Sequence, residues 1–361
     1  YQFTLQLQAM KSQVIVLLFV VTCVTIDAKL LHGKTNDKQD YTSNDVYNQS
    51  KENVTVDRLN QPENYEYGQQ CPDVEDIAPC ICTYDSMSNA TDLDCSDVES
   101  EDQLKQIFKA DFPVKNFRRF ILKSNDNLNV LESYVFNGIS FEELTCNYNQ
   151  LEIIETHALD SCYETATQLD FRGNNITAYP FEELKHFSKL NVFSISKNLL
   201  NMIPADAFHG LTTLEKLYIN TNTPNIVGEF EDLPNLEYID LEQNGITSIP
   251  SKLVNTGSSI LRGIFLSTNK IVSVEPGAFD IVEGLKIQMM SNLLSTLEEA
   301  TWRPYLEAGG TLYANGNPLI CGCDIAWLFA EDHLLKQVSD GTACAGGEFV
   351  HDLDPSKFDN C

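Results

Sequence analysis

The segment LEYIDLEQNGI, residues 236–246, carries apolar side chains at its first, fourth, sixth and last positions and an asparagine at its ninth. The same pattern returns along much of the chain. It recurs in FEELTCNYNQL (141–151), ATQLDFRGNNI (166–176), LNVFSISKNLL (190–200), LEKLYINTNTP (214–224) and LRGIFLSTNKI (261–271). Repetition of one short unit predicts an array of stacked repeats, in which each unit packs against its neighbours.

The asparagine sets the period of this array. Successive asparagines are separated by 24, 25, 24, 24, 22, 25, 23 and 25 residues. They are Asn125, Asn149, Asn174, Asn198, Asn222, Asn244, Asn269, Asn292 and Asn317. Spacings in this range are typical of leucine-rich repeats. The units at 117–128 and 284–294 match the pattern less well, so their register stays open by one residue.

The residue types of the unit have a physical explanation. Positions four and six alternate with polar neighbours, as in a strand with one buried face. The asparagine turns the chain, and its amide can pair with backbone groups that stacking buries. One unit alone cannot bury its apolar face, so stability comes from stacking. We therefore predict an α/β solenoid, a leucine-rich-repeat horseshoe of about nine repeats over residues 113–319 with a parallel concave β-sheet.

Two groups of cysteines stand where a solenoid needs caps over its exposed ends. Each group contains a C-x-C and two outer cysteines, and we predict an N-terminal cap over 71–112 and a C-terminal cap over 320–361. Four thiolates can bind zinc, but structural zinc sites favour wider spacings and reducing compartments. Four cysteines allow three pairings, and cysteines one residue apart bridge poorly with each other. We favour the pairings Cys71–Cys82, Cys80–Cys95, Cys321–Cys344 and Cys323–Cys361.

Cys146 and Cys162 remain within the repeats, both at positions that normally take an inward apolar residue. Because an exported protein meets an oxidising compartment, we expect a disulfide between them. Burial as two free thiols is the alternative.

The beginning of the chain has the pattern of an export signal. We expect the signal to start at Met10, so that residues 1–28 comprise upstream residues and a signal peptide. Lys11 supplies a positive start, and the apolar core at 14–24 is too short to span a bilayer comfortably. The polar segment 29–70 follows without helical or strand periodicity, and we interpret it as a flexible leader, with a propeptide as the alternative.

The four N-x-S/T sequons can be glycosylated only if the protein is exported, because glycosylation occurs along the secretory route. The predicted glycosylation sites are Asn48, Asn53, Asn89 and Asn175. No apolar run after the signal is long enough for a transmembrane helix. We expect a secreted, extracellular glycoprotein.

The composition narrows the classes of function. The 24 basic and 52 acidic residues give a net charge of −28, which argues against nucleic acid and anionic lipid as partners. Motifs of hydrolases, metalloproteases and nucleotide-binding enzymes are missing from the sequence, and the six histidines are scattered. We expect no catalytic residue, no metal, no cofactor and no enzymatic activity.

The outward positions three, five, seven and eight of the unit form the candidate binding surface, because the core does not constrain them. Aromatic side chains there are typical anchors of protein interfaces, although exposed strands also favour them. We expect basic residues of the first unit, such as Arg119, to contribute less. The predicted protein-binding residues are Tyr148, Arg172, Tyr218, Tyr238, Asp240, Phe265 and Tyr313.

Two resemblances add to this interpretation. NPLICGCDIAWL, residues 317–328, resembles the start of the C-terminal cap of extracellular leucine-rich-repeat proteins. The segment CPDVEDIAPCICTY (71–84), followed by LDCSDVESEDQL and FKADFPVKNFRRFILKSNDNLNVLESYVF, is similar to the non-catalytic subunit of the secreted luciferases of oplophorid shrimp. That resemblance implies arthropod origin, secretion and a non-enzymatic role beside a separate catalytic subunit.

Together these features predict a secreted, non-enzymatic scaffold that binds an extracellular protein through its concave sheet. An accessory subunit of a secreted enzyme, such as a luciferase-like protein, is one form of this hypothesis. A receptor or pattern-recognition ectodomain that binds an extracellular ligand is the alternative.

Overall fold

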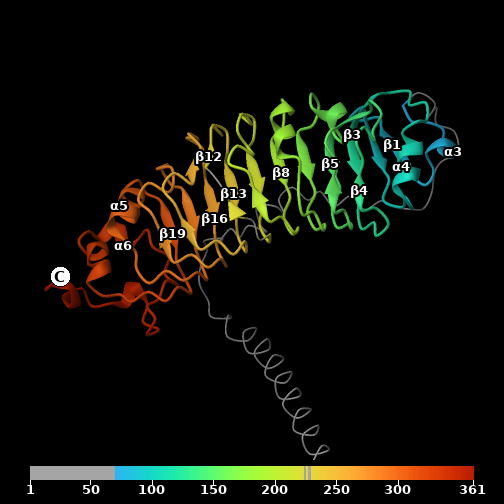
Figure 1. Ribbon diagram of the computed structural model, residues 1–361. Helices are drawn as coiled ribbons and strands as arrows, with labels where there is room; N and C mark the ends of the chain where they lie inside the picture. Colours follow the sequence, from blue (N-terminus) through green and yellow to red (C-terminus); the bar gives the residue numbers. More distant parts are fainter. Residues whose placement is uncertain (1–69, 223–224, 227–228) are drawn as a thin grey trace, which may run out of the picture. The chain divides into compact units, whose positions relative to one another are not determined.

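The described part of the chain is one leucine-rich-repeat solenoid built on a single large sheet. A computed structural model describes residues 70–222, 225–226 and 229–361 (Figure 1). The predicted signal peptide, the predicted leader up to residue 69, and the sequons at Asn48 and Asn53 lie outside these residues. The C-terminal coils end in helices, and an antiparallel strand pair stands at the other end of the row of coils (Figure 1).

The sheet has eleven strands within the described residues. Nine of them come from the repeats and pair in parallel in the order of the sequence. These are β3 (Asn116–Ile121), β5 (Ser140–Thr145), β7 (Gln168–Asp170), β8 (Val192–Ser194), β10 (Lys216–Tyr218), β13 (Tyr238–Asp240), β16 (Gly263–Phe265), β18 (Lys286–Gln288) and β19 (Thr311–Tyr313). The order confirms the predicted leucine-rich-repeat architecture.

The register is regular from the first unit to the last. Phe120 of β3 pairs with Leu144 of β5, and Ile287 of β18 pairs with Ile264 and Leu312 on either side. The two weaker units therefore follow the same alignment as the others, without an offset. Residues at positions four and six are buried along the whole row, because alternation turns them all toward the core.

The asparagines connect successive coils. Asn198 is typical: its Nδ2 donates to the carbonyl oxygens of Phe171 at 2.9 Å and Ile195 at 3.0 Å, and its Oδ1 accepts from Ile176 N at 3.0 Å. Each such amide satisfies backbone groups that the stacking removes from water. The polar ladder is thus part of the core, as the sequence predicts.

The returning limbs close the core with short parallel strand pairs and 3₁₀ turns. The strands are β4 (Val130–Leu131) with β6 (Ile153–Ile154), β9 (Met202–Ile203) with β11 (Asn225–Ile226), β12 (Phe230–Glu231) with β15 (Val254–Asn255), and β14 (Ser248–Ile249) with β17 (Ser273–Val274). The 3₁₀ turns are η1 (Asp160–Cys162) and η2 (Phe181–His186).

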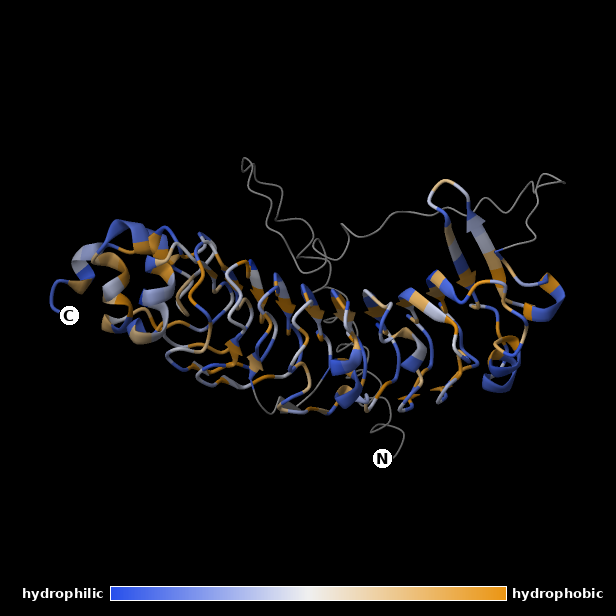
Figure 2. Ribbon diagram, turned by 90° about the horizontal axis from the view of Figure 1, so that it is seen from above, coloured by the Kyte–Doolittle hydropathy of each residue, from blue (hydrophilic) through white to orange (hydrophobic). Residues whose placement is uncertain are grey.

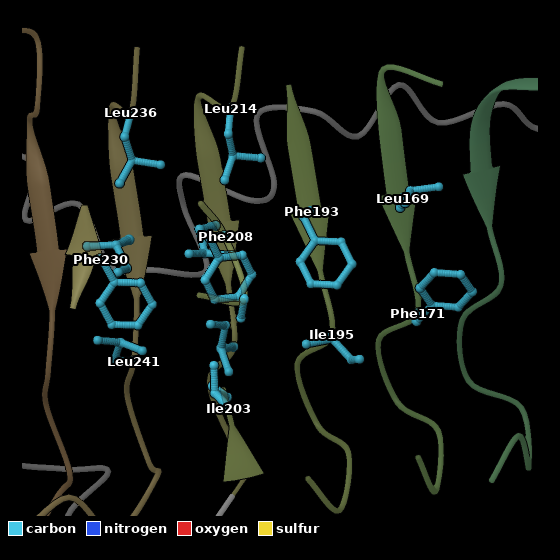
Figure 3. Packing of buried hydrophobic residues seen from close by; sticks show 14 of the residues in the cluster. Leu169, Phe171, Phe193, Ile195, Ile203, Phe208, Leu214, Phe230, Leu236 and Leu241 are labelled. Atoms are coloured by element: carbon cyan, nitrogen blue, oxygen red, sulfur yellow. The ribbon is translucent and has the colours of Figure 1, made fainter. Parts of the chain in front are cut away.

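Equivalent side chains of neighbouring coils stack on one another. Figure 3 shows Leu214 and Leu236 at one level of adjacent strands, and the rings of Phe208 and Phe230 lie beside each other with centroids 5.8 Å apart. Hydrophobic residues recur along each coil in the view of Figure 2. The core is therefore a continuous column, and each coil depends on the next one for burial.

The N-terminal cap covers the first coil. It consists of α3 (Val74–Ile77), the antiparallel pair β1 (Ile81–Asp85) and β2 (Ala90–Asp94), and α4 (Glu101–Ile107). Ser100 caps α4 because its side chain accepts from Gln103 N. The cap contains disulfides between Cys71 and Cys82 and between Cys80 and Cys95, the pairings favoured above.

The helix α5 (Glu299–Glu307) lies in the returning limb between β18 and β19. The C-terminal cap covers the last coil with η3 (Cys323–Phe329), α6 (Asp332–Leu335), η4 (Val350–Asp352) and η5 (Pro355–Phe358). Trp327 is buried, and its Nε1 donates to Leu297 O at 2.9 Å. The disulfides join Cys321 to Cys344 and Cys323 to Cys361, again as favoured. Both cysteines of each C-x-C thus form disulfides with the outer cysteines of the same cap, and all four cysteines of each cap are oxidised.

The expected disulfide between Cys146 and Cys162 is wrong in this structure, in which both are buried free thiols. Cys146 occupies position six of its unit, where other units place Ile195 or Leu241. Both thiols lie in the hydrophobic core, and burial raises the pKa of Cys162 to about 11. The apolar position decides the role of these residues, and they pack as small hydrophobic side chains.

Thiol titration distinguishes these two states of Cys146 and Cys162. We expect the denatured, unreduced wild type to expose two more thiols that react with an aromatic disulfide reagent than the C146S/C162S variant exposes. The native protein should react slowly at both sites, because the reactive thiolate is disfavoured when the thiol is buried. An equal thiol count for the two denatured proteins would contradict the structure and restore the disulfide.

Candidate protein-binding face

The concave face consists of the side chains at positions three, five, seven and eight of the units. The register of the sheet places these side chains in rows that cross the strands. Along the position-five row the C-terminal half has Tyr218, Asp240, Phe265, Gln288 and Tyr313 as successive neighbours. The seven predicted binding residues therefore lie on one face, but they do not form one cluster.

Tyr148 and Arg172 meet near the N-terminal half of this face. The Tyr148 ring is exposed, and the Arg172 guanidinium carbon lies 5.3 Å from the centre of the ring. A Cβ on Gly173 would come within 2.7 Å of the ring, so only glycine lets the tyrosine lie this close to the backbone. The Tyr148 ring is thus held beside Arg172 and Gly173 while it stays exposed to solvent.

Tyr238 and Phe265 meet in the C-terminal half. Their rings stack with centroids 6.4 Å apart and an interplanar angle of 21°. Gly263 stands at position three between them, and a Cβ there would contact both rings at 3.1 Å. The missing side chain of Gly263 lets the two rings pack over the sheet.

The expectation that the aromatic residues of position five are exposed is wrong for two of the three. Tyr218 is only 4% exposed and Phe265 only 3%. Asp240, which stands between them in the row, is 2% exposed. The ring of Phe265 packs against that of Tyr238. Tyr238 and Tyr313 are half-buried, and Tyr313 is separated from Phe265 by Gln288.

The carboxyl group of Asp240 is the most perturbed acid of this face. Burial raises its pKa to about 8, the nearby charge of Glu242 acts in the same direction, and a hydrogen bond from Glu242 N at 3.0 Å opposes them. A buried carboxylate without a positive neighbour is unstable, so the proton stays on at neutral pH. The concave face therefore contains a neutral acid in register with Tyr218 and Phe265 on the two neighbouring strands.

The raised pKa of Asp240 makes stability depend on pH. Between about pH 4 and about pH 8 the folded chain holds a proton that the unfolded chain releases, so stability falls as the pH rises. We expect a contribution of up to about 1.4 kcal/mol per pH unit, levelling off above pH 8. Urea unfolding of wild type and D240N across this range measures it, because asparagine cannot ionise. Parallel curves for the two proteins would contradict the perturbed carboxyl.

The sequence did not predict a cluster of charged side chains at the N-terminal end of the sheet. Asp92 of β2 binds Arg118 and Arg119 together, with Nη2–Oδ2 distances of 2.6 and 2.8 Å. Burial alone would raise the pKa of Asp92, but the two guanidinium groups hold it below its usual value. Burial raises the pKa of the neighbouring Glu143. Arg118 and Arg119 are thus engaged in ion pairs within the fold.

The described residues contain no group of three or more His, Cys, Asp or Glu side chains placed to hold a metal ion. A shallow groove of about 370 Å³ on the returning limbs includes His209 and Asp232, whose Nδ1 and Oδ2 lie 3.5 Å apart. The other lining residues are Gly210, Thr212, Pro234, Thr256 and Gly257. The Thr256 hydroxyl donates to Asp280 Oδ2 at 2.6 Å, and no described hydrogen bond joins His209 to either threonine. The groove does not offer the set of groups that acyl or phosphoryl transfer requires.

The two sequons inside the described residues differ in access. Asn89 lies exposed in the turn between β1 and β2, and its Oδ1 accepts from the Tyr84 hydroxyl at 2.8 Å. Asn175 is half-buried, and its Nδ2 donates to Gln150 Oε1 at 2.7 Å. Both remain predicted glycosylation sites, with Asn89 the more accessible. Across the described residues, none of the helices has the length and hydrophobicity needed to cross a bilayer.

Comparison with known proteins agrees with this architecture. The family model described as "Leucine rich repeat" matches residues 164–223, and "BspA type Leucine rich repeat region (6 copies)" matches 203–303. The chain is 30% identical over 315 residues to the Oplophorus-luciferin 2-monooxygenase non-catalytic subunit of Oplophorus gracilirostris, covering 80% of this chain and 87% of the subunit. The chain belongs to the family of that subunit. The resemblance predicted from the N-terminal cap is therefore confirmed.

Members of other leucine-rich-repeat groups match more distantly. Toll-like receptor 9 of Mus musculus is 25% identical over 54% of this chain, and the match spans only 20% of the receptor. The crystal structure of a TLR13–ssRNA13 complex aligns with a TM-score of 0.51 and 26% identity, over 62% of this chain and 31% of that one. These matches and the family support a binding scaffold rather than an enzyme.

Proposed function

We propose that the protein is an extracellular, non-enzymatic scaffold that binds another secreted protein through its concave face, as the accessory subunit of a secreted enzyme. The observation that carries the proposal is the family relationship to a subunit named non-catalytic, over most of its length. The four cap disulfides fit an oxidising, extracellular location. The partly accessible aromatic side chains of the concave face are suited to a protein interface.

The test is recovery of the partner from the secreted fluid of the source animal with a tagged form of the whole chain. The informative variant changes Tyr148, Tyr238 and Tyr313 together to alanine, since these side chains are exposed or half-buried. Tyr218 and Phe265 are unsuitable, because their burial would make the variant a test of folding. We expect wild type to retain one protein in stoichiometric amount and the triple variant to lose it.

A matched control changes three exposed apolar residues of the returning limbs, Ile153, Met202 and Val272, to alanine. This control removes a similar amount of apolar surface away from the concave face and should retain the partner. Loss of the partner from both triple variants, or from neither, would refute the concave face as the interface. Circular dichroism of all three proteins checks that the variants fold.

A receptor or pattern-recognition ectodomain is the second candidate. The match to Toll-like receptor 9 and the aligned TLR13 structure favour it, although the chain spans a small part of either protein. Under this hypothesis the protein would be recovered from secreted fluid without a stoichiometric companion. It would gain a ligand only when microbial material is added, and that outcome separates the two candidates.

A further inference from the structure

The large sheet ends differently at its two edges. At the C-terminal edge Leu312 of β19 donates to Gln337 O at 2.8 Å and accepts from Ser339 N at 2.9 Å, so the cap continues the backbone pairing. At the N-terminal edge the outermost strand is β1, which pairs with β2 alone within the described residues. An open strand edge presents backbone donors and acceptors that another strand can bind.

The strand β2 uses alternate residues for its two neighbours. Cys95, directly after β2, donates its N–H to Ile121 O of β3 at 2.8 Å. Backbone groups of successive residues in a strand point in opposite directions, so those of Asp94 point toward β1, where its register partner is Ile81. The same alternation within β1 directs the backbone groups of Ile81 and Thr83 toward β2.

Cys82 and Tyr84 therefore point their backbone N–H and C=O groups out of the sheet. Across the described part of the chain, these groups have no hydrogen-bond partner. The edge closes again at Cys80, whose N–H donates to Ile77 O at 2.7 Å. The open edge is thus short and has Thr83 at its centre.

The side chains beside this edge are open to solvent. Ile81 is 55% exposed, and Thr83 and Asp85, on the same side of β1, are exposed as well. Val74 of α3 and Met87 of the turn after β1 are 77% and 97% exposed. The N-terminal cap therefore leaves room for a second strand at β1, and it offers apolar side chains to the chain that brings this strand.

We propose that β1 pairs with β1 of a second copy of this chain, antiparallel and with a twofold axis at Thr83. The outward groups are self-complementary, because Cys82 can exchange both N–H···O bonds with Tyr84 of the second copy, and Tyr84 with Cys82 of that copy. Thr83 then faces Thr83 of the second copy as a non-hydrogen-bonded pair, in which paired threonines contribute stability. This single register satisfies every outward group of the edge.

The dimer should be weak and should depend on salt. Pairing of one short strand buries less surface than a stable complex needs, so self-association should appear only at high protein concentration. Two chains with a net charge of −28 repel each other, and Asp73, Glu75 and Asp76 are exposed beside and within α3. Salt screens this repulsion, so the association constant should rise at least about threefold between about 50 mM and about 500 mM salt.

Sedimentation velocity of the whole chain over a range of protein and salt concentrations measures this association. T83K is the informative variant, because the register places the two lysines directly opposite each other, and edge strands of monomers tolerate lysine. T247K is the matched control, since Thr247 is exposed on a returning limb and the variant gains the same charge. We expect T83K to weaken the dimer at least about tenfold and T247K to leave it unchanged.

Cross-linking tests the register itself. In the proposed dimer the Cα atoms of the two Thr83 residues lie about 4.5 Å apart, within the range of a disulfide, so mild oxidation of T83C should give a covalent dimer. I81C is the matched control, because Ile81 faces Asp85 of the second copy and lies too far from the other Ile81. Mass spectrometry of unreduced peptides should identify the link between the two cysteines at position 83.

Three outcomes would overturn the proposal. They are a wild-type chain that stays monomeric at every concentration and salt level, equal association of T83K and T247K, and equal cross-linking of T83C and I81C. A strand of another protein as the true occupant of the edge would give the first of these outcomes. The proposed function does not depend on the dimer, since the concave-face variants test it separately.

Discussion

Replacement of Asn198 by alanine is expected to lower the free energy of unfolding by about 3–4 kcal/mol. The amide of Asn198 satisfies the carbonyl groups of Phe171 and Ile195 and the N–H group of Ile176, all within 3.0 Å. Alanine leaves these buried groups unpaired, because the stacked coils exclude the water that would replace the amide. Urea unfolding followed by circular dichroism measures the loss.

Two further variants test whether the loss of stability in N198A comes from the hydrogen bonds of the buried amide. N198D retains an acceptor but cannot donate, and it places a charge in the core, so it should destabilise the protein at least as much as alanine. Asn235 is exposed, and its Nδ2 donates to Thr212 O at 2.7 Å. N235A should cost less than about 1 kcal/mol. A loss for N198A as small as that for N235A would show that the ladder is dispensable.

The sequence predicted the column of coils because the determinants of that column are local and periodic. Positions four and six and the asparagine recur at nearly constant spacing, and the inward direction of the alternate residues follows from strand geometry. The same reasoning could have predicted the state of Cys146, since position six takes buried Ile195 and Leu241 in other units. The position of Cys146 in the repeat unit predicts its free-thiol state, whereas the expected oxidising compartment predicts a disulfide.

The concave face was less predictable than the core, because its burial depends on contacts between different strands. Alternation identifies which residues leave the core, but exposure at position five depends on the side chains beside it. Gly263 was the available signal, since a glycine at position three leaves room for the rings of Tyr238 and Phe265 to pack. The pairing of Asp92 with Arg118 and Arg119 required the register of β2 with β3, which no repeat specifies.

Replacement of Phe120 by alanine is expected to destabilise the N-terminal end of the column by about 3–5 kcal/mol. Phe120 is fully buried, and its ring lies 6.1 Å from Phe108 of the cap, 5.0 Å from Phe136 and 5.2 Å from Phe141. Its loss removes apolar contacts from the cap and from the first two coils at once. F120L keeps part of the volume and should cost roughly 1–1.5 kcal/mol.

The residues that lose hydrogen-exchange protection in F120A show whether each coil is stabilised only by its neighbours. Because each coil contacts only its neighbours, F120A should reduce hydrogen-exchange protection most strongly between residues 101 and 145 and leave the coils beyond β13 protected. Phe349 is 47% exposed, so F349A should cost less than about 1 kcal/mol and leave the first coils unaffected. Loss of protection along the whole chain in F120A would show instead that the column unfolds as one cooperative unit, and the cap would then stabilise the distant binding face as well as the first coil.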